Sequence, residues 1–416
     1  MPTKPQEIYT GIEIGTSSIK VAICSVADDY AVTLLGWGEA PSLKVIKGEI
    51  KDRDFVLQQI ARAIKKATDE AQVDIKDTYI TLAIPNRLLD LVETVGKISF
   101  EGESLQITED HLVAANRQAA YQPKDDSLEV DRQYTRFYSI NDRILLNPVG
   151  NVSTFIEAHK HSIVIHKRQL AAYATTVTDI TECPLNTVAF TPMALACAIF
   201  QGGPKPPEGY LLIDIGAGIT SYCLYTGEDF YTMGQITVGC DHAANDLSIA
   251  FALPIHSTQK ILRDFANLQC SVIPIGDGRS RLIAADQGIG GTSKNIPASA
   301  VEQIVLVRFQ ELFNIIDRKM ENEDAWRWAT GGVMLSGGGA QIPKIAELAS
   351  KVFRKPVTIA HAVNVTGDKE IVSSPANVVP FGLVRFGKQD CCIENENHPK
   401  DVGGKLTEIW RALINW

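Results

Sequence analysis

The most informative stretch of the chain is Gly209-Tyr210-Leu211-Leu212-Ile213-Asp214-Ile215-Gly216-Ala217-Gly218-Ile219-Thr220-Ser221-Tyr222-Cys223-Leu224-Tyr225. An apolar run, an acid, a Gly-x-Gly turn and a second, half-apolar run predict a buried strand, a tight turn and a hairpin partner. At the end of a strand, Asp214 can hold a metal ion, while Gly216 and Gly218 let backbone N–H groups approach a phosphate.

Two other stretches strengthen this interpretation. Near the start, Gly11-Ile12-Glu13-Ile14-Gly15-Thr16-Ser17-Ser18-Ile19-Lys20-Val21-Ala22-Ile23 repeats the acid-Ile-Gly pattern. The pair predicts duplicated halves that face each other across a phosphate. Towards the end, Val333-Met334-Leu335-Ser336-Gly337-Gly338-Gly339-Ala340 precedes a helix expected over 342–352. A strand, three glycines and a helix would put a helix N-terminus beside a nucleotide.

Composition limits the class of protein. The chain has 416 residues, of which 45% are hydrophobic and 21% charged, which is typical of a globular protein with two or more domains. The net charge of −9, with no basic patch, argues against nucleic acid as a partner. No signal peptide and no apolar run of membrane-spanning length are recognised. The eight cysteines form no C-x-x-C pair, so reduced thiols and a cytoplasmic protein are expected.

The first part of the chain predicts a βββαβ pattern. Strands are expected at 8–25, 30–37, 46–51 and 79–84, and a helix over 52–71 that is capped by Asp52 or Asp54. From 86 to 167, an alternating strand, a helix capped by Thr108 and further strands indicate an inserted α+β module. His159, His161 and His166 lie in it; strand-surface or interface positions are favoured over metal binding.

The last residues predict an amphipathic helix. Five apolar side chains recur at i, i+3, i+4, i+7 and i+8 and share one helical face, namely Leu406, Ile409, Trp410, Leu413 and Ile414. The polar segment before them is expected to be a flexible linker. A helix buried in the core is the alternative, but the linker and the two tryptophans favour an interfacial membrane anchor.

These elements, in this order, resemble the actin, sugar-kinase and heat-shock-70 superfamily, and within it the chain is most similar to FtsA, the family of bacterial actin-like cell-division proteins. The resemblance covers nearly the whole chain. The residues that carry it are 12–20, 108–121, 147–150, 211–225, 245–251 followed by Pro254, 310–312 and 336–342.

The resemblance implies an α/β, actin-like two-lobed ATPase fold with an inserted small α+β (SHS2-like) module and a C-terminal amphipathic helix. The module would replace actin's second subdomain in a different place. The expected division is lobe 1 at 8–85 with 169–195 and 373–388, the module at 86–168, lobe 2 at 196–372 with an outer subdomain at 240–320, a flexible linker at 389–403 and the membrane-binding helix at 404–416.

The implied cofactors are ATP and Mg²⁺, bound between the lobes. Glu13 and Asp214 would hold the metal, through water. The expected nucleotide-binding residues are Gly15, Thr16, Ser17, Ser18, Lys20, Gly216, Ala217, Gly218, Asn245, Asp246, Gly337, Gly338 and Gly339. Gly15 and the hydroxyl groups after it would contact the β- and γ-phosphates, the three glycines the α-phosphate and adenosine, and Asn245 with Asp246 the ribose.

Two departures from the family pattern bear on activity. The family's second hairpin usually reads Asp-x-Gly-Gly-Gly-Thr-Thr-Asp, whereas Ala217 and Ile219 stand here at a glycine and a hydroxyl position. Ahead of Pro192 the family commonly has Glu, and this chain has Thr191. Since Thr is not acidic enough to orient an attacking water, ATP binding is better supported than hydrolysis, which is expected to be slow or absent. No catalytic residue is assigned.

As an FtsA-like protein, the chain is expected to polymerise on the inner face of the cytoplasmic membrane at the division site and to tether the FtsZ ring. Its implied partners are the FtsZ C-terminal peptide on the outer face of lobe 2, further copies of itself, phospholipid, and other division proteins through the module. Two alternatives remain: a soluble PilM-type adaptor for pilus or secretion assembly, and a small-molecule kinase. The predicted tail favours the first interpretation over the second, and no convincing catalytic Asp supports the third.

Overall fold

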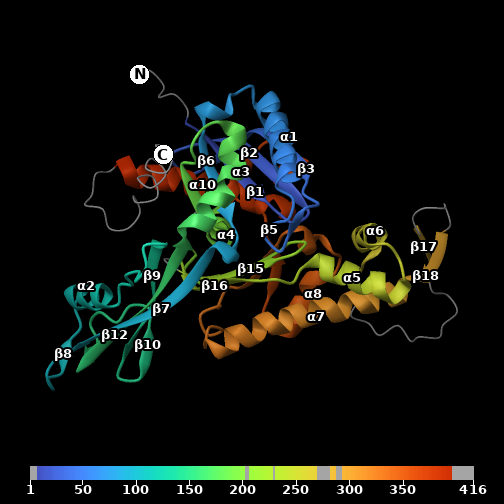
Figure 1. Ribbon diagram of the computed structural model, residues 1–416. Helices are drawn as coiled ribbons and strands as arrows, with labels where there is room; N and C mark the ends of the chain where they lie inside the picture. The colour runs from blue at the N-terminus through green and yellow to red at the C-terminus, as the bar shows by residue number, and fades with distance from the viewer. Residues whose placement is uncertain (1–6, 202–205, 228–229, 269–281, 287–292, 396–416) are drawn as a thin grey trace.

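The computed structural model describes residues 7–201, 206–227, 230–268, 282–286 and 293–395. Lobe 1 is built on a six-stranded sheet in the order β13-β6-β1-β2-β3-β21 (Figure 1). Its strands are β1 (Ile8–Ile14), β2 (Ser18–Val26), β3 (Val32–Pro41), β6 (Tyr79–Ile84), β13 (Thr187–Phe190) and β21 (Val365–Thr366). The short strands β4 (Val45–Ile46) and β5 (Glu49–Ile50) pair separately.

Lobe 2 repeats this plan in a five-stranded sheet with the order β16-β15-β14-β19-β20. Its strands are β14 (Tyr210–Ile215), β15 (Thr220–Tyr225), β16 (Phe230–Ile236), β19 (Gly332–Ser336) and β20 (Val357–Ile359). In each lobe three strands form an antiparallel meander, and two later strands add in parallel beside its first strand. The duplication predicted from the two hairpins is therefore present in the topology.

Helices cover both sheets. In lobe 1 they are α1 (Arg53–Ala71), α3 (Lys167–Thr181), α4 (Thr191–Phe200) and α10 (Val378–Asn395). In lobe 2 they are α5 (Cys240–Phe251), α6 (Ile255–Phe265), α7 (Ala298–Asn322) and α8 (Ile345–Phe353), with a hairpin of β17 (Leu282–Asp286) and β18 (Ser293–Pro297) beside them. The short α9 (Lys369–Val372) lies between β21 and α10.

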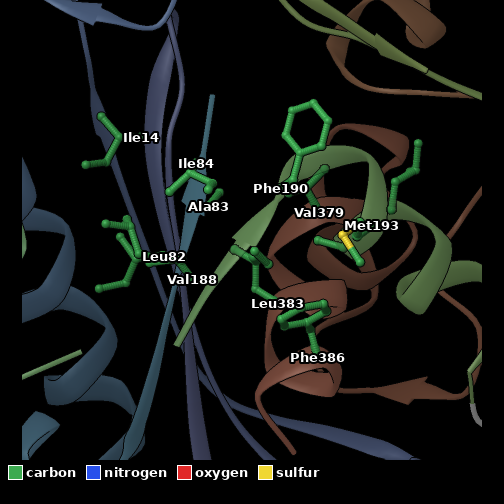
Figure 2. Packing of buried hydrophobic residues seen from close by; sticks show 14 of the residues in the cluster. Ile14, Leu82, Ala83, Ile84, Val188, Phe190, Met193, Val379, Leu383 and Phe386 are labelled. Atoms are coloured by element: carbon green, nitrogen blue, oxygen red, sulfur yellow. The ribbon is translucent and has the colours of Figure 1, made fainter. Parts of the chain in front are cut away.

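The core that joins the lobes is formed around α4 and α10. Figure 2 shows side chains of β1, β6 and β13 on one side and of these two helices on the other, packed into one apolar cluster. The cluster continues through α4 onto Leu212, Cys223 and Met233 of the lobe 2 sheet. Gly382 permits the close approach of the helices, because a Cβ there would lie 1.8 Å from the Ala194 carbonyl oxygen. A second cluster fills the other face of the lobe 2 sheet beneath α5 to α8.

The inserted module projects away from lobe 1 beside lobe 2 (Figure 1). Its sheet has the order β10-β9-β12-β7, with α2 (Glu109–Gln118) packed on one face and its own small core. The strands are β7 (Leu89–Ser99), β9 (Leu128–Ile140), β10 (Arg143–Leu145) and β12 (Phe155–His166), and a small separate pair is formed by β8 (Leu105–Gln106) and β11 (Val152–Ser153). As expected, Thr108 caps α2, and Asp52 caps α1 by accepting from the Phe55 N–H at 3.1 Å.

Two expected boundaries are wrong. The glycine triplet leads into a 3₁₀ turn at Gly338–Gln341, and α8 begins only at Ile345. Pro343 explains the delay, because a proline disfavours helical geometry in the residue before it, and Ile342 is extended. The linker expected from 389 also begins too early, since α10 continues to Asn395. Gln389 and Asp390 hold this extension through contacts with Gln201 and Arg132.

The predicted anchor at 404–416 lies outside the described residues. Among the helices of the described part of the chain, none is long and apolar enough to cross a bilayer.

Candidate functional site

The turns of the two predicted hairpins face each other across the gap between the lobes. A Cβ placed on Gly218 would lie 2.7 Å from Thr16 Oγ1, so the turns are in contact and glycine is required at this point. Both turns close in the same way: the Gly15 N–H donates to the Ser18 carbonyl at 3.1 Å, and the Gly216 N–H to the Ile219 carbonyl at 2.9 Å. The two sites thus have matching backbone geometry.

This closure changes which amides can meet a phosphate. Gly15 was expected to offer its backbone, but its N–H is used inside the turn, as is that of Gly216. Within the described chain, the amides of Thr16, Ser17, Ala217 and Gly218 have no hydrogen-bond acceptor. Ala217 has an ordinary negative φ, which explains why it can replace glycine. Each turn therefore presents two successive N–H groups, the kind of backbone arrangement that binds anions.

The amino end of α5 packs on the second turn. The Cys240 and Asp241 amides donate to the carbonyls of Gly216 and Ala217 at 3.0 and 2.8 Å. A Cβ on Gly239 would lie 2.5 Å from both carbonyl oxygens. Only glycine at this position therefore lets the start of α5 come so close to the turn. The helix thereby fixes the conformation of the turn.

Glu13 and Asp214 both line a cavity of about 80 Å³ between the turns, far larger than the roughly 15 Å³ that one water needs. Burial raises the pKa of Glu13 to about 7, and the charge of Asp214 contributes to the rise. Glu13 Oε2 is buried without a hydrogen-bond partner within the described residues. Burial also raises the pKa of Asp214, although Ser336 Oγ donates to its Oδ1 at 2.9 Å and opposes the shift.

The two carboxyl groups fit a divalent cation only in part. Among the described residues, no group of three or more acidic, His or Cys side chains could surround a metal ion. Mg²⁺ commonly keeps several waters and takes one or two carboxylates plus substrate phosphates. A buried, unpartnered Glu13 oxygen beside Asp214 matches that need. These two side chains could hold Mg²⁺, which would supply positive charge against phosphate oxygens.

The other predicted nucleotide-binding residues do not all lie at the cavity. Lys20 stands opposite Glu13 in the β1–β2 pair, and its ammonium donates to the Ala376 carbonyl. Gly337, with φ +86°, packs its backbone against Ile215, and Gly338 has open space around it. The triplet therefore lies beside the second turn without lining the cavity.

Asn245 and Asp246 do not line the cavity either. Asn245 is exposed on α5. Asp246 makes a two-point ion pair with Arg308 of α7, with N–O distances of 2.7 and 2.9 Å. A ribose contact by Asp246 would have to compete with this pair.

Tyr173, Gln235 and Gly48 are among the cavity residues that sequence reasoning did not assign to the site. Tyr173 comes from α3, and burial raises the pKa of its hydroxyl. Gln235 comes from β16, where it lies opposite Ser221 of the second hairpin. Gly48 has φ +76° and contacts Pro85. In the sequence, only its suitability for a tight turn distinguishes this glycine. The available signals were a polar glutamine in the mostly apolar β16 and a glycine suited to a tight turn at position 48.

Comparison with known proteins agrees with this architecture. A sequence model of the family described as "Cell division protein FtsA" matches residues 211–382. The "Cell division protein FtsA" of Buchnera aphidicola (subsp. Schizaphis graminum) is 23% identical, over 100% of this chain and 98% of that protein. The chain is thus similar to FtsA proteins along its whole length.

Solved structures show the same fold. The structure described as "PilM-PilN type IV pilus biogenesis complex" matches with a TM-score of 0.61 and 18% identity, covering 92% of this chain and 99% of its own. MreB5 of Spiroplasma citri bound to AMPPNP matches with a TM-score of 0.54 and 14% identity, covering 94% and 100%. The expected actin-like fold and the resemblance to FtsA are thus confirmed.

Proposed function

We propose that the chain is an ATP-binding, actin-like bacterial division protein of the FtsA type. The observation that carries this is a match to FtsA proteins along the whole chain, combined with two like turns that face each other over a pair of acids. The MreB5 structure with this fold holds AMPPNP, which supports a nucleotide at the corresponding place. ATP would bind with its β- and γ-phosphates between the turns, and Glu13 and Asp214 would hold Mg²⁺ through water.

The domain division proposed from the sequence is kept, with the linker shortened to begin after α10. Lobe closure on the nucleotide would set the subunit shape that stacks into filaments. Residues 404–416 would lie in the membrane interface, where five apolar side chains could contribute several kcal/mol, less the cost of ordering the helix. Single copies would bind weakly, and filaments firmly through avidity. Such a filament, on the cytoplasmic face of the membrane, would tether FtsZ.

The PilM-type adaptor remains the second candidate because that fold match has a TM-score of 0.61. Co-sedimentation with lipid vesicles and electron microscopy, each with and without Mg-ATP, separate the two. Full-length chain should form filaments and pellet with vesicles, whereas a chain ending at Gly403 and the Trp410→Glu variant should stay in the supernatant. Equal pelleting of all three would remove the anchor and favour the soluble adaptor.

The outer face of lobe 2 is the proposed docking surface for the FtsZ C-terminal peptide. The apolar stripe of α7 is buried as predicted, and Ile304 is partly exposed. Arg318 of α7 is exposed, and Ile249 of α5 and Val307 of α7 are exposed apolar side chains at 74% and 59%. Arg308 is less available than expected, because it pairs with Asp246 and Glu311. Arg318 is therefore the better probe of docking.

Charge reversal at the two arginines should give different results. Arg318→Glu is expected to weaken binding of an FtsZ C-terminal peptide severalfold with little change in stability, whereas Arg308→Glu should cost about 1 kcal/mol of unfolding free energy by breaking its pairs. Peptide binding by fluorescence anisotropy and urea unfolding measure both. Unchanged peptide affinity in Arg318→Glu would place the docking surface elsewhere.

Hydrolysis of ATP is expected to be slow. Thr191 lines the cavity where an acid would be needed, and its hydroxyl donates only a long bond, 3.5 Å, to the Ile84 carbonyl. Turnover should therefore lie well below the roughly 10 per second of a typical enzyme. Phosphate release by purified protein measures it, with Asp214→Ala as the control for contaminating ATPase. Fast release that disappears in the control would point to another water-orienting residue.

A further inference from the structure

Gln235 connects the cavity to the base of the inserted module. Its Nε2 donates to Ser221 Oγ at 3.0 Å, and Ser221 lies opposite Asp214 in the β14–β15 pair. A polar row of Asp214, Ser221 and Gln235 thus crosses three strands of lobe 2 at the cavity. On its other side, Gln235 Oε1 accepts from the Asn86 N–H at 2.7 Å. Asn86 follows β6 and Pro85, where the chain leaves lobe 1 for the module.

The other end of β16 contacts the body of the module. The Tyr231 carbonyl of β16 accepts from Arg136 Nε at 2.6 Å. Phe137 stacks on Tyr231 with ring centroids 5.6 Å apart, and Tyr134 packs edge-on against Phe230 at 5.9 Å. Strand β16 therefore touches the module at both ends.

Arg136 is the central polar contact of this interface. Its side chain is 6% exposed and pairs with Glu93 of β7 at 3.0 Å and with Glu323, just after α7, at 2.6 Å. One guanidinium thus ties two strands of the module to two segments of lobe 2. Arg136 is buried whereas both glutamates are partly exposed, so undocking or removal of these carboxylates would leave a buried guanidinium without its compensating charges. His159 and His161 of β12 lie beside Glu93 within the sheet of the module.

We propose that β16 couples the cavity to the docking of the module on lobe 2. A nucleotide in the cavity weakens this docking, and the docked module weakens nucleotide binding. This rests on the proposed nucleotide binding. A terminal phosphate between the turns would accept from Gln235 Nε2, which now donates to Ser221, and would draw the carboxamide towards the cavity. As the carboxamide turns to the phosphate, its bond to Asn86 is lost and the base of the module is released. Gln235 is in this account a positioning residue.

Linkage makes the proposal testable at the far end of β16. Coupling free energies are reciprocal, so loosening the module must tighten nucleotide binding by the same factor by which nucleotide loosens the module. Arg136→Met is expected to tighten Mg-ATP binding about fivefold, the low end of typical coupling. In the Gln235→Met background the same change should have less than about a twofold effect, because the link to the cavity is already broken. General damage to the fold would weaken binding in both backgrounds.

The experiment is a double-mutant cycle on the Kd of Mg-ATP, measured by calorimetry on the full chain. Arg143→Met, an exposed arginine of β10 in the same module, is the matched control and should leave Kd unchanged. Glu323→Gln, which loosens one arm of the contact, replaces Arg136→Met if that variant fails to fold. Unchanged or weakened affinity in the Arg136 or Glu323 variant, or equal shifts in both backgrounds, overturns the coupling. Absence of ATP binding by the wild-type chain overturns the proposed function and the coupling with it.

Discussion

Replacing Asp214 by alanine should weaken Mg-ATP binding roughly 10- to 100-fold, the range typical of groups that orient a metal's ligands. Asp214 is 9% exposed at the cavity wall, and among the described residues its one hydrogen-bond donor is Ser336. Burial raises its pKa, so the carboxylate lacks the compensation that its charge requires. A divalent cation beside it would provide that compensation.

The fold should survive this change, because alanine removes a buried charge and leaves only the Ser336 hydroxyl without its acceptor. Circular dichroism and urea unfolding check this, and Asp69→Ala, an exposed position on α1, is the matched control for nucleotide affinity. If a fluorescent ATP analogue binds Asp214→Ala as tightly as the wild type, the second hairpin does not hold the metal.

Arg385→Met is expected to have the largest effect on stability, a loss of about 3 kcal/mol or more in unfolding free energy. The Arg385 side chain is fully buried in α10. Its guanidinium donates to the backbone carbonyls of five residues, Tyr30, Cys197, Ala198, Val363 and Asn364. Burial lowers its pKa to about 10, so it remains charged at neutral pH. The substitution removes all five of these hydrogen bonds, although the Cys197, Ala198 and Asn364 carbonyls keep a backbone N–H donor within the described residues.

Four of the five carbonyls belong to the segments that cross between the lobes, namely the end of α4 and the stretch before β21, and the fifth, that of Tyr30, lies between β2 and β3 of lobe 1. Arg385 therefore stabilises the connection between the lobes as well as lobe 1. Arg354→Met is the control: this side chain is 74% exposed and makes only long ion pairs, 3.5 and 3.7 Å. Urea unfolding that gives the same free energy for Arg385→Met and wild type would show that the arginine is not required.

Local patterns predicted the framework well. The two hairpins, the caps Asp52 and Thr108 and the buried stripe of α7 all depend on residues close together in the sequence, and the structure contains each of them. The same holds for the contact of the two turns, because repeated hairpins dictate a repeated topology. The start of α8 was misplaced because the effect of Pro343 on Ile342 outweighed the apolar spacing.

Contacts between distant segments could not be predicted in this way. Arg385 stands in an apolar run, and its acceptors come from separate parts of the chain. The role of Gln235 follows only from its hydrogen bond with Asn86, which lies across the gap between the lobes. Asp246 looked like a ribose ligand by analogy, yet Arg308, on another helix, occupies its carboxylate. In each case a polar side chain is explained by a partner far away in sequence.

The central claim is that a nucleotide places its terminal phosphates between the two hairpin turns. The most direct measurement is an experimental structure of the full chain with Mg²⁺ and AMPPNP. The account predicts phosphate oxygens at about 3 Å from the amides of Thr16, Ser17, Ala217 and Gly218, and Mg²⁺ beside Glu13 and Asp214. Nucleotide bound at another place, or an empty cavity at saturating Mg-AMPPNP, would contradict it.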